Sequence, residues 1–299
     1  MDPWKAHGSV LEDERRRDGS VERALTIFLA GAECPFTCSF CDLWRYTIDG
    51  PTPAGALPKQ IADTLATLNE SPTRIKLYNA SNFFDRRAVP LDDLPRIAEL
   101  CAPFVGVTVE SHASTIGPMT LDFARRVSKL EVAIGLETIH VEARAHLNKR
   151  LDLDRFEAAA SFLADNDIAL RVFVLLSAPY VPPDASVEWA VRSAEYAARC
   201  GAGVVSIIPV RGGNGEMERL AELGHFTPPT LAELESALDL CVGWEETVVT
   251  ADLWDAERLG SCAHCRDERI ERMRRINVKG RAEPRVRCSQ CTESERLPA

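Results

Sequence analysis

The chain has 299 residues, of which 45% are hydrophobic and 27% charged, with ten cysteines and a formal net charge of −10. A chain of this length can bury a large core without disulfide bonds. No apolar run reaches the roughly 18 residues of a membrane span, and the start of the chain lacks the apolar stretch of a secretory signal. We therefore expect a cytoplasmic protein without membrane contact, in which reduced cysteines favour metal binding over disulfides. The acidic balance argues against a general nucleic-acid coat but allows a local basic patch.

Residues 1–20 carry many charges, which predicts a short surface helix or a frayed tail. From Ala24 on, apolar runs typical of buried strands alternate with amphipathic stretches typical of helices. The expected strands are Ala24–Ala30, Arg74–Tyr78, Val105–Val109, Val132–Leu136, Leu170–Leu176 and Val204–Val210, with a short further run at Thr247–Ala251. The helices expected between them are Lys59–Leu68, Leu91–Leu100, Leu121–Val127, Val141–Leu147 with Leu153–Asn166, Val187–Arg199 and Thr230–Leu240.

Strands that alternate with helices predict βαβ units around a parallel sheet. Right-handed crossovers would curl six such units into a partial (β/α)6 barrel of the TIM-like type, which we place at residues 21–250 after the charged tail at 1–20. Beyond residue 250 the chain becomes rich in arginine, poor in aliphatic residues and bracketed by cysteines. We expect a small four-cysteine metal-binding module at residues 251–299.

Three cysteines, Cys34, Cys38 and Cys41, follow the first expected strand at C-x3-C-x2-C spacing. Structural zinc sites usually take four protein ligands, so three thiolates are incomplete for zinc. A [4Fe–4S] cluster normally takes four thiolates, so three would leave one iron free to bind another molecule. Parallel barrels build their sites on loops at the carboxyl ends of the strands, where this group falls. A chance grouping and a zinc knuckle are the alternatives.

This spacing, with the aromatic Phe40 before the last cysteine, resembles the radical S-adenosylmethionine (SAM) superfamily. Three longer phrases resemble the branch of the archaeosine-synthesis radical SAM enzyme and, more loosely, the Elp3-like and oxygen-independent coproporphyrinogen oxidase-like enzymes. The phrases are KLYNASNFFDRRAVP (Lys76–Pro90), EVAIGLETIHVEARAHLNKRLDLDRF (Glu131–Phe156) and VFVLLSAPYVPP (Val172–Pro183). The resemblance covers roughly residues 20–245. It implies a cluster whose unique iron is chelated by SAM, and an electron that cleaves SAM to methionine and a 5′-deoxyadenosyl radical.

The resemblance also implies contacts to the amino-acid part of SAM. Most relatives have a Gly-Gly-Glu turn after the second strand, which binds the SAM amino group. This chain has Asn79, Ser81 and Asn82 in that stretch, where backbone carbonyls could serve instead, and the alternative is an ordinary turn. Lys149 in LNKR matches a basic residue that pairs with the SAM carboxylate, a sensible partner for a carboxylate that leaves bulk water. A solvated charge at a helix end is the alternative for Lys149.

Further positions match contacts to the rest of SAM. Glu110 in VTVES matches an acidic SAM-contacting position, and Glu137 in IGLET matches a Gln or Glu position near the ribose. A structural hydrogen-bond pair at two strand ends is the alternative for both. Some relatives carry an Asp near the adenosine on the fifth strand, where this chain has Phe173. Arg171, near the start of that strand, is a weaker candidate for the adenosine contact.

Substrate contacts are expected from loops at the same mouth of the barrel, and each candidate has an ordinary surface role as its alternative. The candidates are Asp85, Arg86, His112, Tyr180 and Arg211. Arg211 opens the glycine-rich segment 211–215, whose backbone could approach a ligand closely. The segment lacks the spacing of a phosphate-binding fingerprint, so it is interpreted as a substrate loop or a flexible connection.

The second cysteine group consists of Cys262, Cys265, Cys288 and Cys291, two C-x2-C pairs separated by 22 residues. Four such thiolates can hold a tetrahedral zinc ion or an auxiliary iron–sulfur cluster. The segment 266–287 between the pairs has nine basic and four acidic residues, a net charge of +5 that could contact nucleic-acid phosphates. A solvated, salt-bridged metal module without a partner is the alternative. The isolated cysteines are expected to be buried packing residues: Cys101, Cys200 and Cys241.

The sequence thus predicts a radical SAM enzyme that uses a [4Fe–4S] cluster, SAM and an electron donor such as flavodoxin or ferredoxin. Two substrate classes remain open. RNA base modification, with tRNA as the partner, is favoured by the archaeosine-type resemblance and the basic segment. Small-molecule or natural-product chemistry is favoured by the acidic barrel. An iron–sulfur and zinc protein with a sensing or structural role, and no catalytic activity, is the alternative from a different class.

Overall fold

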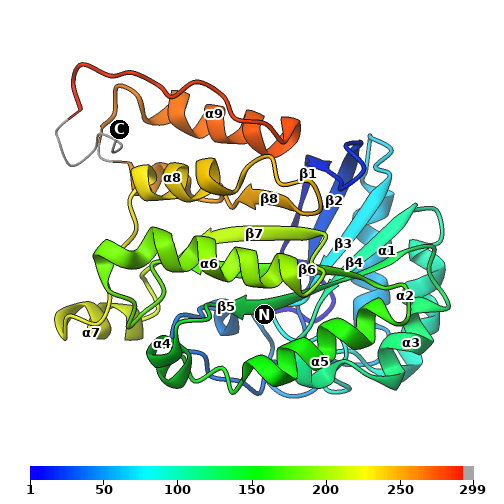
Figure 1. The fold of residues 1–299 in the computed structure, drawn as a ribbon. Coiled ribbons are helices and arrows are strands. Elements are labelled where there is room, and N and C mark those ends of the chain that lie inside the picture. Colours follow the sequence, from blue (N-terminus) through cyan, green and yellow to red (C-terminus); the bar gives the residue numbers. More distant parts are fainter. Residues whose placement is uncertain (261, 292–299) are drawn as a thin grey trace.

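The computed structural model describes residues 1–260 and 262–291 of the chain. These residues form an eight-stranded sheet whose strands lie side by side in the order of the sequence. The strands are β1 (Gly8–Arg15), β2 (Val21–Phe28), β3 (Arg74–Tyr78), β4 (Gly106–Glu110), β5 (Leu130–Glu137), β6 (Ala169–Leu176), β7 (Val204–Pro209) and β8 (Val248–Ala251). β1 pairs antiparallel with β2, and each later strand pairs parallel with the strand before it. The sheet curves into a nearly closed barrel (Figure 1).

Helices follow the parallel strands and cover the outside of the barrel (Figure 1). They are α1 (Ala56–Ala66), α2 (Leu94–Cys101), α3 (Pro118–Ala124), α4 (Val141–His146), α5 (Leu153–Ala164), α6 (Ser186–Arg199), α7 (Glu216–Glu222), α8 (Leu231–Cys241) and α9 (Arg266–Lys279). Short 3-10 turns lie at Leu43–Tyr46, Leu91–Asp93, Ala113–Thr115, Pro183–Ala185 and Ala256–Leu259. The predicted α/β, TIM-like fold is confirmed, with the predicted strands and helices shifted by a few residues at their ends. β1, α7 and α9 were not predicted from the sequence.

The two faces of each strand have different surroundings, because successive side chains of a strand point to opposite faces. On β2, Leu25 and Ile27 are fully buried and belong to the hydrophobic core between the sheet and the helices. Ile75 and Leu77 occupy the same face of β3 and are also fully buried. The residues between them face the barrel interior, where polar and charged side chains collect. The apolar runs predicted from the sequence are therefore strands buried on both faces. The outer face packs against the helices, and the inner face meets polar and charged side chains inside the barrel.

The prediction of a helix or frayed tail at residues 1–20 was wrong, because this segment contains β1. Gly8 lies opposite Phe28 and Arg15 opposite Val21, so β1 pairs along the whole of β2. The charged residues of this segment suggested a solvated surface, but some of their side chains face the barrel interior. Glu14 is 8% exposed and forms ion pairs inside the barrel. A polar strand is stable here because charged partners meet its inward side.

Inward-facing side chains near the amino ends of the parallel strands form a buried network of ion pairs. Arg171 lies 2.9 Å from a carboxylate oxygen of Glu131 and 2.9 Å from one of Glu14. Lys76 Nζ lies 3.1 Å from Glu14, and Arg16 lies 2.7 Å from Glu131. Burial alone would raise the pKa of Glu14, but Arg171 and Lys76 outweigh burial and lower this pKa to about 2. The amino end of the barrel is therefore filled with matched charges.

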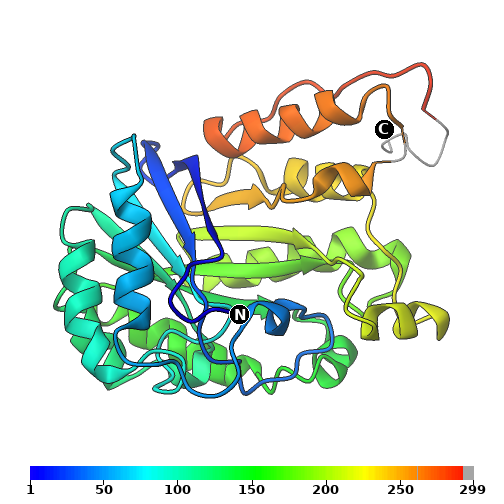
Figure 2. The ribbon, with the colours of Figure 1, turned by 180° about the vertical axis from the view of Figure 1, so that it is seen from behind.

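Helix α9 lies against both ends of the open sheet, since it contacts β1 and β8. Figure 2 shows it running alongside β8, near the antiparallel pair at the other end of the sheet. The Asn277 side chain donates to the carbonyl of Ala251 at 2.8 Å and accepts the N–H of Ala251 at 2.9 Å. These bonds satisfy backbone groups at the exposed edge of β8, which would otherwise be free to pair with another strand.

Candidate active site

The segment 29–42 leaves the carboxyl end of β2 and carries Cys34, Cys38 and Cys41, all partly buried. It is named here the cysteine loop. The N–H of Cys41 donates to the carbonyl of Cys38 at 3.1 Å, which places these two cysteines on one turn. Burial raises the pKa of Cys38 to about 12 and that of Cys41 to about 11, and neighbouring thiols add to both shifts. A group that binds these sulfurs as thiolates must therefore bring positive charge with it.

The residues after β3 bring polar groups to the same end of the barrel. Nδ2 of Asn82 lies 3.4 Å from Sγ of Cys34, so this stretch contacts the cysteine loop. Asn79 is 0% exposed, and within the described chain neither polar atom of its amide has a hydrogen-bond partner. The hydroxyl of Ser81 is also buried without a partner among the described residues. Because buried amides are nearly always hydrogen-bonded, Asn79 and Ser81 indicate a place that suits a polar ligand.

Glu110 ends β4 beside this stretch. One of its oxygens accepts the N–H of Ala80 at 3.0 Å, and Ala80 has a φ of 53°, in the left-handed region. Burial raises the pKa of Glu110 to about 7, although its backbone hydrogen bonds and the charge of Lys149 oppose the rise. A cation placed beside Glu110 would keep this carboxyl group ionised at neutral pH.

Glu137 and Lys149 form an ion pair, with Nζ 2.5 Å from Oε1. Glu137 ends β5 with a φ of 68°, at an irregularity in the pairing of β5 with β6. A Cβ atom at Gly135 would lie 2.1 Å from Glu137 Oε1 and 2.5 Å from Lys149 Nζ, so the pair requires glycine there. Burial opposes a charge on Lys149, but Glu137 outweighs it and raises the pKa of Lys149. The Lys149 charge also acts on Cys38, so the pair belongs to the cysteine site.

His112, predicted as a substrate residue, is 5% exposed and lies within the scaffold of the site. The N–H of Ser114 donates to its Nδ1 at 3.1 Å, which leaves the proton on Nε2, 3.2 Å from the carbonyl of Lys149. Burial lowers the pKa of His112 to about 4, so the imidazole is neutral. The ring stacks on Phe36 of the cysteine loop at 4.0 Å between centroids. His112 therefore links the cysteine loop to Lys149, and its contact with substrate stays a prediction.

The other residues predicted for substrate lie at three separate places. Asp85 accepts the N–H of Arg87 at 2.8 Å and so forms a turn after β3, on which Arg86 is exposed. Arg211, after β7, pairs with Asp252 at 2.8 Å and donates to the carbonyl of Trp254. Asp252 and Trp254 were not singled out from the sequence, because they lie just beyond a four-residue strand with little pattern of its own.

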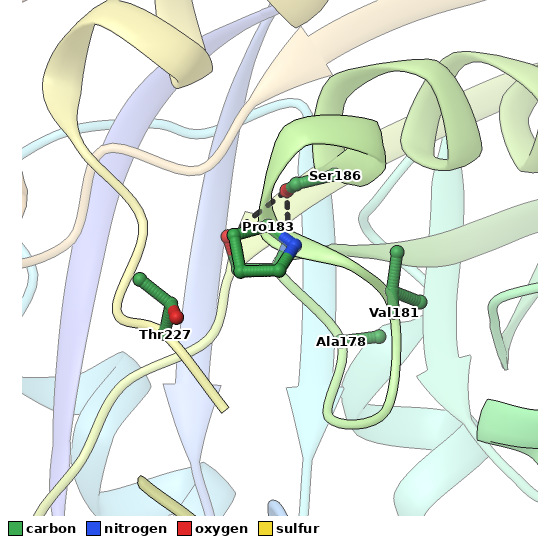
Figure 3. Close-up of a pocket in the computed structure, with 6 residues that line it drawn as sticks. Ala178, Val181, Pro183, Ser186 and Thr227 are labelled. Carbon is green, nitrogen blue, oxygen red and sulfur yellow. Dashed lines mark hydrogen bonds between the residues drawn. The ribbon is translucent and has the colours of Figure 1, made fainter. Parts of the chain in front are cut away.

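Tyr180 lies between two histidine rings, with centroids 4.5 Å from His146 and 4.8 Å from His225. The loop that carries it is fixed where β6 ends, because the N–H of Ser177 donates to Oγ of Ser186 at 2.9 Å. Figure 3 shows the shallow depression at this point, lined in part by Ser186 and Pro183. The depression has no enclosed volume for a ligand, so this loop contributes rigidity here.

Arg171 and Phe40, both predicted as cofactor contacts, lie in different parts of the barrel. Arg171 is not brought to the cysteine site, because its guanidinium is held by Glu14 and Glu131 at the opposite end of the barrel interior. Phe40 lies on the cysteine loop and packs against a small apolar cluster that includes Met217 of α7. This packing was not predicted, because α7 was not expected from the sequence pattern.

The four C-terminal cysteines Cys262, Cys265, Cys288 and Cys291 gather in one place, with all four sulfurs within 4.8 Å of one another. Sγ of Cys262 lies 3.9 Å from that of Cys288, and Sγ of Cys265 lies 3.3 Å from that of Cys291. α9 begins directly after Cys265, so the helix separates the two pairs in sequence. This group could hold a metal ion. The predicted module extends to residue 299, and its last eight residues, 292–299, lie outside the described residues.

Much of the positive charge of segment 266–287 is used in ion pairs. Arg272 is 1% exposed and lies 2.6 Å from Asp239 of α8, while Arg269 lies 2.5 Å from Glu235 on the same helix. The remaining pairs that involve this segment are Arg266–Asp267, Arg272–Glu235, Arg274–Glu271, Arg275–Glu283, Lys279–Glu283 and Arg285–Asp239. Arg269 and Arg272 therefore attach α9 to α8, and the carboxylates of Glu235 and Asp239 on α8 offset part of the segment's net charge of +5.

Comparison with solved structures gives matches across most of the chain. Methylornithine synthase (PylB) matches 86% of this chain and 69% of its own, with a TM-score of 0.59 and 14% identity. Elp3 from Methanocaldococcus infernus matches 73% of this chain and 59% of its own, with a TM-score of 0.53 and 13% identity. SuiB from Streptococcus suis matches 78% of this chain and 48% of its own, with a TM-score of 0.53 and 12% identity. These proteins are radical SAM enzymes.

The chain has the radical SAM fold. Its likeness to these structures is one of fold, at 12–14% identity, and it spans about half to two thirds of their length. No family model and no curated protein matches the sequence. In this fold, the cysteine loop follows β2, and the polar groups described above lie at the carboxyl ends of β3, β4 and β5. None of the described helices is long and apolar enough to cross a bilayer.

Proposed function

We propose that the chain is a radical SAM enzyme, in which Cys34, Cys38 and Cys41 bind a [4Fe–4S] cluster. The observation that carries the proposal is the contact of Asn82 with Cys34 at the carboxyl end of the barrel, in the same stretch as the Asn79 amide, which is buried without a partner among the described residues. Bound there, the cluster would supply the electron that cleaves SAM into methionine and a 5′-deoxyadenosyl radical. The radical would abstract hydrogen from an unactivated carbon of the substrate, a step beyond ordinary acid–base residues.

The residues present fit such a group. Soft thiolates are the ligands that iron–sulfur clusters take, and three of them leave one iron for SAM. The other cysteines of the described chain lie in or beside the outer helices α2, α6 and α8, or in the C-terminal group. The cationic iron would also offset the burial that keeps the cysteine thiols protonated.

The chain's own groups would position SAM. Glu110 and the Asn79 amide are suited to the ammonium group, because one can carry a negative charge and the other has free hydrogen-bonding capacity. Lys149 is suited to the SAM carboxylate. Its side-chain ammonium group, which is paired with Glu137, would then bind both carboxylates. His112 and Phe36 keep this corner of the site packed, which helps to exclude water from a reactive intermediate.

We further propose that the C-terminal cysteines hold one zinc ion. Zinc–sulfur bonds of about 2.3 Å in a tetrahedron place the sulfurs about 3.8 Å apart. The separations of 3.9 Å for Cys262 and Cys288, and 3.3 Å for Cys265 and Cys291, suit this arrangement. Thiolates on a four-iron cluster each bind a different iron and would lie further apart. Zinc here would have a structural role, in fixing α9 against the edge of the barrel.

The substrate and the cellular setting belong to the same proposal. The paired charges of segment 266–287 favour a small-molecule or natural-product substrate over tRNA. A reduced low-potential donor of the flavodoxin or ferredoxin class would supply the electron. Ten cysteines, without a disulfide among those of the described chain, suit the cytoplasm. We assign residues 21–250, together with β1, to the barrel and residues 251–299 to the metal module.

Anaerobic reconstitution tests the function. We expect about four irons and one zinc per chain, and release of 5′-deoxyadenosine when SAM and dithionite are added. Cys200→Ala serves as the matched control and should keep both metals, because Cys200 lies beside α6. Iron without any 5′-deoxyadenosine would favour the sensing or structural alternative, and about eight irons without zinc would overturn the zinc assignment. Faster SAM cleavage on addition of bulk tRNA would overturn the small-molecule preference.

A further inference from the structure

Three asparagine side chains from three different loops hold the cysteine loop. We propose that Asn82, Asn148 and Asn214 form a clamp that keeps the three thiols in register, and that Asn82 also tunes the cluster by donating to the Cys34 sulfur. This proposal rests on the proposed function, because it concerns the group that the thiols would bind.

Asn82 has a defined orientation between two partners. The backbone N–H of His112 donates to its Oδ1 at 2.7 Å, and a backbone N–H can only donate. Its Nδ2 must therefore face Sγ of Cys34, which lies 3.4 Å away. Asn82 is 4% exposed, so water does not compete for this contact. The amide thus presents an N–H to the thiolate that would bind iron.

Asn148 holds the middle of the cysteine loop. Its Nδ2 donates to the carbonyl of Thr37 at 2.9 Å and to the Thr37 hydroxyl at 2.6 Å. The carbonyl of the preceding residue, Leu147, accepts the N–H of Ser39 at 3.0 Å, so two neighbouring residues bind the loop by hydrogen bonds. Asn148 has a φ of 54°, a conformation that asparagine tolerates better than most residues.

Asn214 holds the end of the loop from the opposite side. Its Nδ2 donates to the carbonyl of Ser39 at 2.8 Å and to that of Cys41 at 3.3 Å. Its Oδ1 accepts the N–H of Met217 at 2.8 Å, which fixes the amide to the first turn of α7. The loop after β7 is therefore joined to the last cysteine by one side chain.

The clamp has two physical consequences. Partners beyond the ligands orient those ligands, and their loss typically costs about 10–100-fold in metal affinity. Hydrogen bonds to cluster sulfurs also raise the reduction potential, because they stabilise the more negative, reduced state. Asn148 and Asn214 contact the loop through its backbone and hydroxyl groups and, in the described structure, donate to none of its sulfurs, so they should affect retention of the cluster. Asn82 bonds to a sulfur, so it should affect both retention and potential.

The test replaces each asparagine by aspartate, which keeps the shape and the accepting oxygen, removes the donor and adds a negative charge. The variants are Asn82→Asp, Asn148→Asp and Asn214→Asp in the reconstituted holoenzyme. Asn166→Asp is the matched control, because Asn166 is exposed at the end of α5 and donates to the carbonyl of Phe162. Two quantities are measured anaerobically: the rate of iron release to a ferrous chelator, and the midpoint potential by redox titration with electron paramagnetic resonance.

We expect all three clamp variants to release iron on the order of tenfold faster than the wild type, and the control to match the wild type. Asn82→Asp should also move the midpoint potential to more negative values, and Asn82→Ala should shift it less in the same direction. Release rates equal to that of Asn166→Asp would overturn the clamp, and an unchanged potential in both Asn82 variants would overturn the tuning. A wild type that binds iron but cleaves no SAM would refute the proposed function, while these measurements would still decide the clamp. A wild type without iron on the cysteine loop would overturn both.

Discussion

The two ends of the barrel interior differ in how their buried polar groups are partnered. At the amino end, Glu14, Glu131 and Arg171 lie in ion pairs of 2.9 Å, and the pKa of Glu14 is lowered to about 2. At the carboxyl end, the Asn79 amide has no partner among the described residues, and the pKa of Glu110 is raised to about 7. The same sheet thus neutralises charge at one end and leaves polar capacity unused at the other.

This difference separates stability from function within one barrel. A buried ion pair with both partners present avoids the cost of an unpaired charge, whereas unpaired polar groups and strained backbone oppose the folded state. Left-handed backbone occurs at Ala80, Glu137 and Ser177, at or just beyond the carboxyl ends of β3, β5 and β6. The costs of burial and strain collect where the proposed site lies, as expected when a bound ligand completes the missing contacts.

The largest predicted effect is a loss of bound iron when one cysteine at the carboxyl end is replaced. Cys38→Ala should reduce reconstituted iron from about four per chain to nearly none, because the cluster loses one of three protein ligands. The zinc content and the stability of the metal-free barrel should stay near those of the wild type. Iron and zinc analysis, together with urea unfolding, checks this outcome. Full iron retention in Cys38→Ala would contradict the assignment of the cysteine loop.

The opposite result is expected at the amino end. Arg171→Gln leaves Glu14 and Glu131 with less positive charge around them in a buried place, which should cost about 3–5 kcal/mol of unfolding free energy. Arg96→Gln is the matched control, because the exposed pair of Arg96 with Glu99 should contribute less than about 1 kcal/mol. Urea unfolding of both variants measures the difference. Equal effects would show that the buried network does not support the fold.

These two ends also differ in how well the sequence predicted them. The cysteine loop, Glu110, Glu137 and Lys149 were chosen as site residues by resemblance, and the structure brings them to one place. The network at the amino end was missed, because its partners come from strands far apart in the sequence. Arg171 was accordingly interpreted as a cofactor contact, although its position early in β6 places it at the other end.

Local patterns explain the remaining differences between prediction and structure. Residues 1–20 appeared to be a short surface helix or a frayed tail, since the last four residues of β1 are all charged and show no alternation of apolar and polar side chains. The asparagine clamp gave no signal, because asparagine is common in turns and its amide partners lie in other loops. The apolar strands were predicted well, because a short apolar run bounded by polar residues can be recognised in the local sequence.

A third prediction concerns the unpaired amide of Asn79. Asn79→Leu removes two buried polar atoms without partners in the described structure, so the SAM-free protein should gain about 1–3 kcal/mol of stability. The same change should weaken SAM binding, because it removes hydrogen-bonding capacity from the proposed ammonium site. Urea unfolding and equilibrium dialysis with SAM measure the two effects. Asn166→Leu, at an exposed position, should change neither, and a loss of stability in Asn79→Leu would refute the interpretation.

The smallest predicted effect is a dependence of stability on pH that begins at Glu110. Its pKa rises from an ordinary value of 4.5 to about 7 in the folded protein, so the folded state binds the proton more tightly. The stability contributed by this group is complete below pH 4.5 and is lost as the pH rises through 7. Between pH 5.5 and pH 7 the SAM-free wild type should therefore lose about 1–2 kcal/mol more than Glu110→Gln, whose amide keeps an acceptor for the Ala80 N–H. Urea unfolding of the two proteins across this pH range measures the difference. If both lose stability equally with pH, Glu110 is already ionised without a ligand and is not reserved for a cation.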